Sequence, residues 1–204
     1  MKDLKEYIKE SLLDDFDTLS KPLSAEAIKE NIKQFLEDNY KHPSKLKISK
    51  KPNKNGFYEV SCKDNIELNN WDIQSLTNRM FIFTTCGGDF ICARRESLTS
   101  LEGAPEIVEG SFNCSWCGNL KSLKGAPKKV GYEFNCSGCD SLTSLEGAPE
   151  EVKDAFICTK CENLTSLKGA PKKVGGNFVC MDGKIKFSED SVKQVSDVKG
   201  RIQV

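Results

Sequence analysis

One chemical pattern recurs every 22 residues through the middle of this chain and constrains its fold more than any other feature. Each unit opens with a phenylalanine and a cysteine two residues apart, and the first four units continue with two leucines and close with Gly-Ala-Pro and a valine. The first cysteine of the successive units is Cys92, Cys114, Cys136, Cys158 and Cys180. A constant period of this length is typical of a protein built from stacked, near-identical coils.

The spacing inside one unit indicates a strand, an extended return and two turns. Phe-x-Cys places two apolar side chains on one face of a strand, and Gly-Ala-Pro interrupts regular structure. A single coil cannot bury its own apolar residues, so neighbouring coils must stack with their strands parallel. We therefore predict an α+β chain whose repeats form a parallel-strand solenoid of about five coils.

The repeat resembles a known family. In Phe156-x-Cys158-x-x-Cys161-x-x-Leu164, the first two residues match the strand leucines of leucine-rich repeats, and Cys161 matches their Asn/Cys turn position. Leu164 follows one residue later than in that pattern. The sequence motif Leu-Thr-Ser-Leu-Glu-Gly-Ala-Pro resembles motifs in repeat proteins of large tailed phages and of gut bacteria. The resemblance implies a leucine-rich-repeat fold in a cytoplasmic protein, in the host cytoplasm or the virion if a phage encodes it.

The flanks of the repeats divide the chain into four predicted segments. They are a helical segment at 1–40, a β-rich N-terminal cap at 41–87, the solenoid at 88–183 and a small C-terminal cap at 184–204. Ser24 is a typical N-cap for a helix in the first segment. The helix expected before it is either a flexible docking segment or a helix packed on the solenoid end.

The two cap segments carry their own signals. A strand is predicted at 184–187, followed by a helix from Ser188 through Lys199 and a last strand at 201–204. Residues 41–56 contain several lysines and no acidic residue. They form either a nucleic-acid patch or a solvated hairpin, and the Pro-Asn-Lys-Asn-Gly turn signal favours the hairpin.

Charge alternates along the return segments, which read Leu-Glu-Gly-Ala-Pro-Glu and then Leu-Lys-Gly-Ala-Pro-Lys. The first of the two resulting columns contains Glu102, Lys124, Glu146 and Lys168. Stacking would place opposite charges side by side, although exposed pairs add little stability and could equally be solvated. The chain as a whole has 30 basic and 30 acidic residues. This balance, with no apolar run long enough for a bilayer, argues against nucleic-acid and membrane partners.

The ten cysteines permit three interpretations. Cys114, Cys117, Cys136 and Cys139 have a spacing that fits a zinc ribbon, and cysteines of adjacent coils could also form disulfides. The spacing follows automatically from the repeat, however, and buried cysteine behaves as a small apolar residue in a reducing cytosol. We favour a buried ladder with a second cysteine in the turn, without a metal.

The most favoured function is a non-enzymatic scaffold that binds a protein partner through the outer face of its strands. Trp116 and Arg94 near the edge of this face are residue types that dominate binding energy. The predicted partner-binding residues are Arg94, Asn113, Ser115, Trp116, Asn135, Ser137, Ile157, Thr159, Val179 and Met181. His42 is the single histidine and no catalytic motif is present, so we expect no enzyme activity, cofactor or small-molecule ligand. The alternative is a structural or phage-particle component docked through its N-terminal helix.

Overall fold

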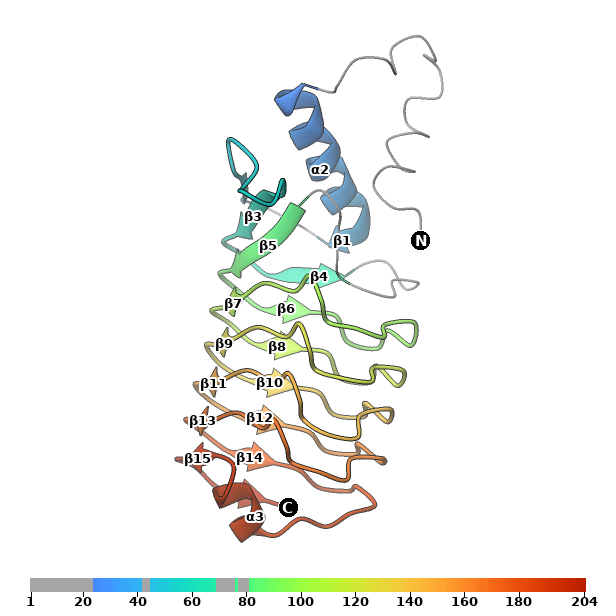
Figure 1. Cartoon of the computed structure of the whole chain (residues 1–204), viewed down its shortest axis with the longest axis vertical. Helices are drawn as coiled ribbons and strands as arrows, with labels where there is room; N and C mark the ends of the chain where they lie inside the picture. The colour runs from blue at the N-terminus through green and yellow to red at the C-terminus, as the bar shows by residue number, and fades with distance from the viewer. Residues whose placement is uncertain (1–23, 42–44, 69–75, 77–80) are drawn as a thin grey trace.

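The computed structural model shows a parallel-strand β-solenoid of about six turns, with a helix at its N-terminal end (Figure 1). It describes residues 24–41, 45–68, 76 and 81–204. The helix expected before Ser24 lies outside the described residues. No helix in the described part of the chain is long and apolar enough to cross a membrane.

The first sheet contains the Phe-x-Cys segments. Its strands are parallel from β4 to β16, and β1 pairs antiparallel with β4. In spatial order they are β1 (Tyr40–Lys41), β4 (Ile66–Leu68), β6 (Phe90–Ile91), β8 (Phe112–Asn113), β10 (Phe134–Asn135), β12 (Phe156–Ile157), β14 (Phe178–Val179) and β16 (Ile202–Gln203). From β6 to β14 each strand is displaced by one repeat from its neighbour, which brings identical positions side by side.

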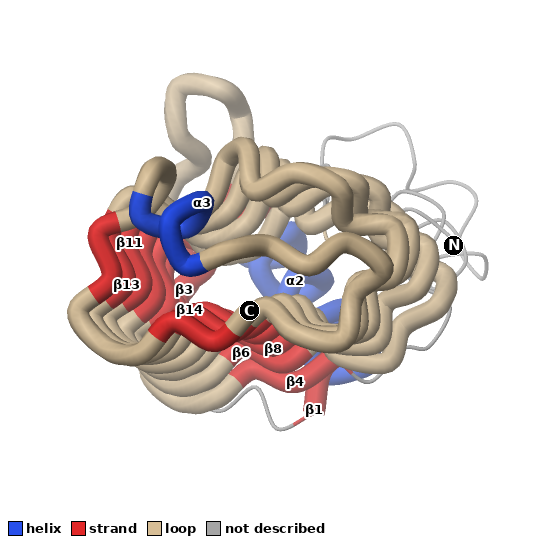
Figure 2. Tube along the Cα trace, turned by 90° about the horizontal axis from the view of Figure 1, so that it is seen from below, coloured by secondary structure: helices blue, strands red, loops and turns tan. Residues whose placement is uncertain are grey.

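The extended return of each coil builds a second sheet. Its strands are β2 (Leu46–Ile48), β3 (Tyr58–Cys62), β5 (Phe81–Cys86), β7 (Ile107–Val108), β9 (Lys129–Val130), β11 (Glu151–Val152), β13 (Lys173–Val174) and β15 (Asp197–Val198). The valine of every unit points inward from this sheet and is buried. Figure 2 shows the two sheets as separate walls of the coil.

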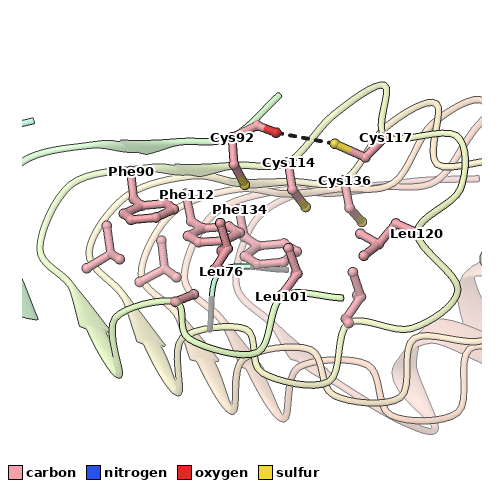
Figure 3. Close-up of a cluster of buried hydrophobic side chains, with 14 of the residues drawn as sticks. Leu76, Phe90, Cys92, Leu101, Phe112, Cys114, Cys117, Leu120, Phe134 and Cys136 are labelled. Carbon is pink, nitrogen blue, oxygen red and sulfur yellow. Dashed lines mark hydrogen bonds between the residues drawn. The ribbon is translucent and has the colours of Figure 1, made fainter. Parts of the chain in front are cut away.

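The core between the sheets is a ladder of phenylalanine rings (Figure 3). The rings of Phe112 and Phe134 have centroids 5.3 Å apart and planes only 6° from parallel. Phe156 continues the stack, whereas Phe178 at the last step is tilted by 33°. All of these rings have no exposed surface. The 22-residue period therefore determines the core directly, because it places like residues in contact.

The expected count of about five coils was too low, because the repeat pattern misses the coil that contains β4. Ile66 pairs with Phe90, and Glu67 pairs with Ile91. Ile66 and Leu68 are buried where later coils have phenylalanine and cysteine. The sequence indicates this coil only through the alternation Ile66-Glu67-Leu68. It places apolar residues on the inward face of a strand, but they are not the phenylalanine and cysteine of the later coils.

The N-terminal segments confirm two local predictions. Helix α2 (Ala25–Asn39) begins where the Ser24 side chain accepts a hydrogen bond from the Ala27 N–H at 3.1 Å. Its apolar face meets the end of the core, where the rings of Phe35 and Phe81 make an edge contact at 5.9 Å. Strands β2 and β3 form the expected antiparallel hairpin.

The C-terminal segment differs from expectation in two places. Residues 184–187 form no strand, because they continue the turn that follows the strands of the first sheet, where Lys184 forms an ion pair with Glu162 at 3.6 Å. Ser188 caps helix α3 (Glu189–Lys193), which ends well before Lys199. The chain leaves the helix there to add β15 to the second sheet. The strand predicted at 201–204 is β16, and α3 lies near it across the end of the solenoid (Figure 2).

Candidate functional site

The outer face of the first sheet carries one central column of predicted partner-binding residues. Register pairs Asn113 with Asn135, Asn135 with Ile157, and Ile157 with Val179. Each of these side chains is half-buried. The structure therefore brings these residues together in one line, as the repeat pattern predicts.

The neighbouring column is polar and largely engaged within the protein. The Asn113 Oδ1 accepts hydrogen bonds from the Ser115 N–H at 3.0 Å and from the Ser115 hydroxyl at 2.7 Å. Thr159 donates its hydroxyl to the Ser137 Oγ at 3.0 Å. Ser115 and Ser137 are buried, with exposed fractions of only 7% and 8%. The hydroxyl groups of both serines hydrogen-bond to other side chains of the protein, so little of either residue is accessible to a partner.

The face is apolar on two adjacent strands near its C-terminal end. Ile157 and Val179 lie side by side on β12 and β14, and Met181, two residues after Val179, has 39% of its surface exposed. The last strand, β16, places Gln203 beside Val179. The central coils carry asparagine at the equivalent positions. The part of the face on β12 and β14 can therefore lose water favourably on contact, while the asparagines of the central coils are already hydrogen-bonded within the protein.

Arg94 and Trp116 lie on the turn that follows the strands, which we call the turn edge. Each has a left-handed backbone, with φ of 58° and 59°, at a position separate from the left-handed glycine of the Gly-Ala-Pro turn. The equivalent residues of the following coils are Gly138, Lys160 and Asp182, and they have the same conformation. The inward and outward alternation of the strand ends at this position. Trp116 consequently projects outward and is 48% exposed.

The Trp116 ring lies beside an open hollow of about 550 Å³ at the turn edge. The hollow is lined by Arg94, Glu96, Trp116, Gly118, Asn119 and Asp140. Two of these lining residues are joined, because the Asn119 side-chain amide donates a hydrogen bond to the Glu96 carbonyl at 2.8 Å. The ammonium of Lys160 lies 5.9 Å from the centre of the indole ring. The hollow thus combines an aromatic ring with charges of both signs.

Three coils have a second cysteine, and its thiol donates a hydrogen bond to a backbone carbonyl of the preceding coil. The thiol of Cys117 donates to the Cys92 carbonyl at 3.3 Å (Figure 3), and Cys139 donates to the Cys114 carbonyl at 3.2 Å. Burial raises the pKa of Cys117 to about 12 and holds that of Cys92 well above its usual range. These two thiols therefore stay protonated at neutral pH, and Cys117 remains able to donate.

Arg95 replaces the second cysteine in the coil that contains β6. Its guanidinium donates to the carbonyl of Leu68, which stands where later coils have the first cysteine. Arg95 is only 5% exposed. The carbonyl at this position of the coil thus accepts a hydrogen bond from arginine where the later coils use a cysteine thiol. The sequence pattern alone did not predict this role of Arg95.

The cysteines do not converge on a point. All ten are free thiols, and the two cysteines of one coil belong to separate columns. Within the residues that the structure describes, no group of three or more histidine, cysteine or acidic side chains could hold a metal ion. The sulfur atoms contact backbone carbonyls and apolar side chains, and thiols of neighbouring coils meet in pairs, such as Cys114 with Cys139.

The predicted charge columns do pair between neighbouring coils. Lys168 and Glu146 lie 2.6 Å apart, and the equivalent Lys124 and Glu102 lie 3.9 Å apart. In the second column, Lys128 meets Glu106 at 3.0 Å. Every partner is more than half exposed, so these pairs neutralise the surface and add little to stability. The single histidine, His42, lies outside the described residues.

Comparison with known proteins adds no family. No protein-family model matches the chain, and neither the curated proteins nor the solved structures give a match.

Proposed function

We propose that this chain is a non-enzymatic leucine-rich-repeat scaffold that binds a protein partner through the apolar part of the outer face of its first sheet, on β12 and β14. The observation that carries the proposal is the alignment of Ile157 with Val179 beside the exposed Met181. Extended strand faces with a few apolar anchors concentrate binding energy at those anchors. The scaffold would act in the cytoplasm, either of a bacterium or of a phage-infected host.

The polarity of the face supports this choice of surface. In the central coils, the asparagine side chains accept hydrogen bonds from the backbone N–H groups of the serines two residues later, so covering them with a partner gains little. The isoleucine and valine that replace them remain half-exposed to water on a rigid ladder of strands. Because these side chains are already ordered, a partner that covers them loses little conformational entropy.

The repeat itself provides a fold-compatible test. Asparagine stands at the Ile157 position in two other coils, as Asn113 and Asn135. The double variant Ile157→Asn with Val179→Asn should therefore keep the fold and remove the apolar anchors. A photo-crosslinking residue placed at 181 would first identify the partner, and calorimetry with that purified partner would then measure affinity.

We expect the double variant to bind at least about tenfold more weakly, equivalent to about 1.4 kcal/mol. Tyr132→Asn is the matched control, because Tyr132 is 62% exposed but lies outside this face. The control should bind like the wild type. If the double variant keeps full affinity while deletion of residues 1–20 abolishes binding, the repeats are a spacer and the protein docks through its N-terminal segment.

A further inference from the structure

Two glycines shape the surroundings of Trp116 at the turn edge. A Cβ atom on Gly138 would lie 2.6 Å from the Trp116 Cε3 atom, so the indole ring occupies the space of a missing side chain. A Cβ atom on Gly118, by contrast, would meet nothing within 4 Å, and its backbone is not left-handed. Neither packing nor backbone geometry therefore requires glycine at 118. Its effect is to keep the hollow beside Trp116 open.

A second hollow on the protein shows why this distinction matters. It has a similar volume of about 550 Å³ and lies over β7, β9 and β11, around Gly131. A Cβ atom on Gly131 would lie 1.9 Å from the Glu109 carbonyl oxygen, so close packing of two coils excludes any side chain there. That hollow is a by-product of stacking. The hollow at Gly118 has no such structural cause.

The charges around the Trp116 ring favour an uncharged ligand. Arg94 and Lys160 contribute two positive charges, and Glu96 and Asp140 contribute two negative charges. A cationic ligand would compete with Lys160 for the indole ring, and an anionic ligand would meet two carboxylates. These opposed charges leave a balanced set of hydrogen-bond donors and acceptors around an aromatic surface.

We propose that the hollow formed by Trp116, Gly118, Arg94, Glu96 and Asp140 binds a neutral sugar ring. A sugar ring offers one apolar C–H face, which packs against an indole. Its edge carries hydroxyl groups that both donate and accept. Glu96 and Asp140 would accept from these hydroxyls, and Arg94 would donate to them. The volume of about 550 Å³ lies in the range of small-ligand sites.

This site is independent of the proposed protein-binding face, because it lies on the turn edge and not on the strands. The test uses the full chain labelled with nitrogen-15. The indole N–H resonance of Trp116 is assigned by its loss in Trp116→Phe, which separates it from that of the other tryptophan. Maltotriose, cellotriose and chitotriose serve as neutral probes, and a tetra-arginine peptide and inorganic phosphate serve as charged probes.

We expect at least one trisaccharide to shift the Trp116 resonance in a saturable way, and neither charged probe to do so. Gly118→Gln should weaken that binding at least tenfold without lowering the melting temperature. This variant is compatible with the fold, because the other coils carry Glu96, Asp140 and Glu162 at the same position. Tyr132→Ala, at the second hollow, should leave binding unchanged.

Three results would overturn the proposal. The first is that no trisaccharide shifts the resonance. The second is that Gly118→Gln binds the trisaccharide as tightly as the wild type does. The third is that the arginine peptide or phosphate gives the saturable shift, which would assign the hollow to a charged ligand.

Discussion

Replacing Phe134 by alanine removes one ring from the middle of the phenylalanine ladder. The ring has no exposed surface and lies between Phe112 at 5.3 Å and Phe156 at 5.4 Å. A phenylalanine buries about 150–250 Å², which corresponds to about 4–6 kcal/mol at 25 cal/mol per Å² and is an upper bound. Measured losses for such substitutions are about 3–5 kcal/mol. We expect a loss in that range, because the parallel strands on both sides prevent collapse of the cavity.

Urea unfolding followed by far-ultraviolet circular dichroism measures this loss. The comparison requires equal slopes for both proteins, since a changed slope would mean that the repeats no longer unfold together. Tyr132→Ala in the same coil is the control. Tyr132 is 62% exposed, so its variant should stay within about 0.5 kcal/mol of the wild type. A loss below about 1 kcal/mol for Phe134→Ala would refute a stacked, buried ladder.

Four further perturbations test other features of the solenoid. Cys139→Ala should cost about 1–3 kcal/mol in the same assay, because a buried carbonyl loses its thiol donor; a neutral result would mean that the thiol column is only space-filling. Gly147→Ala should cost more than about 1 kcal/mol, because Gly147 has φ of 91° and its added Cβ would clash with the preceding coil. Lys168→Glu, which places a like charge beside Glu146, should lower the melting temperature slightly at low salt only. A chelator should leave the melting temperature of the wild type unchanged, and melting on chelation would indicate a structural metal.

The ends of the solenoid were harder to predict than its middle. The coil that contains β4 keeps the inward apolar positions but replaces phenylalanine and cysteine by Ile66 and Leu68. A search for identical residues misses it, although the buried face is the same. At the other end, the stretch 184–187 has strand-like alternation, yet it follows the turn edge. Alternation alone does not say which part of a coil a segment will occupy.

The candidate binding residues divide in a similar way. The central column was predictable, because Asn135 and Ile157 follow directly from strand alternation and from the period. The burial of Ser115 and the outward direction of Trp116 were not, because both lie beyond the strand, where alternation no longer applies. No sequence pattern predicts the hollow at Gly118.

The sequence by itself determines the stack, its core and its surface neutrality. A fixed period forces equal positions of successive coils into contact, so rings meet rings, thiols lie in columns, and lysines meet glutamates. Only the tertiary structure decides what happens where the backbone leaves the strand. There a left-handed residue reverses the direction of side chains, and the return segment becomes a second sheet. These outcomes depend on contacts between coils, which a single repeat unit does not contain.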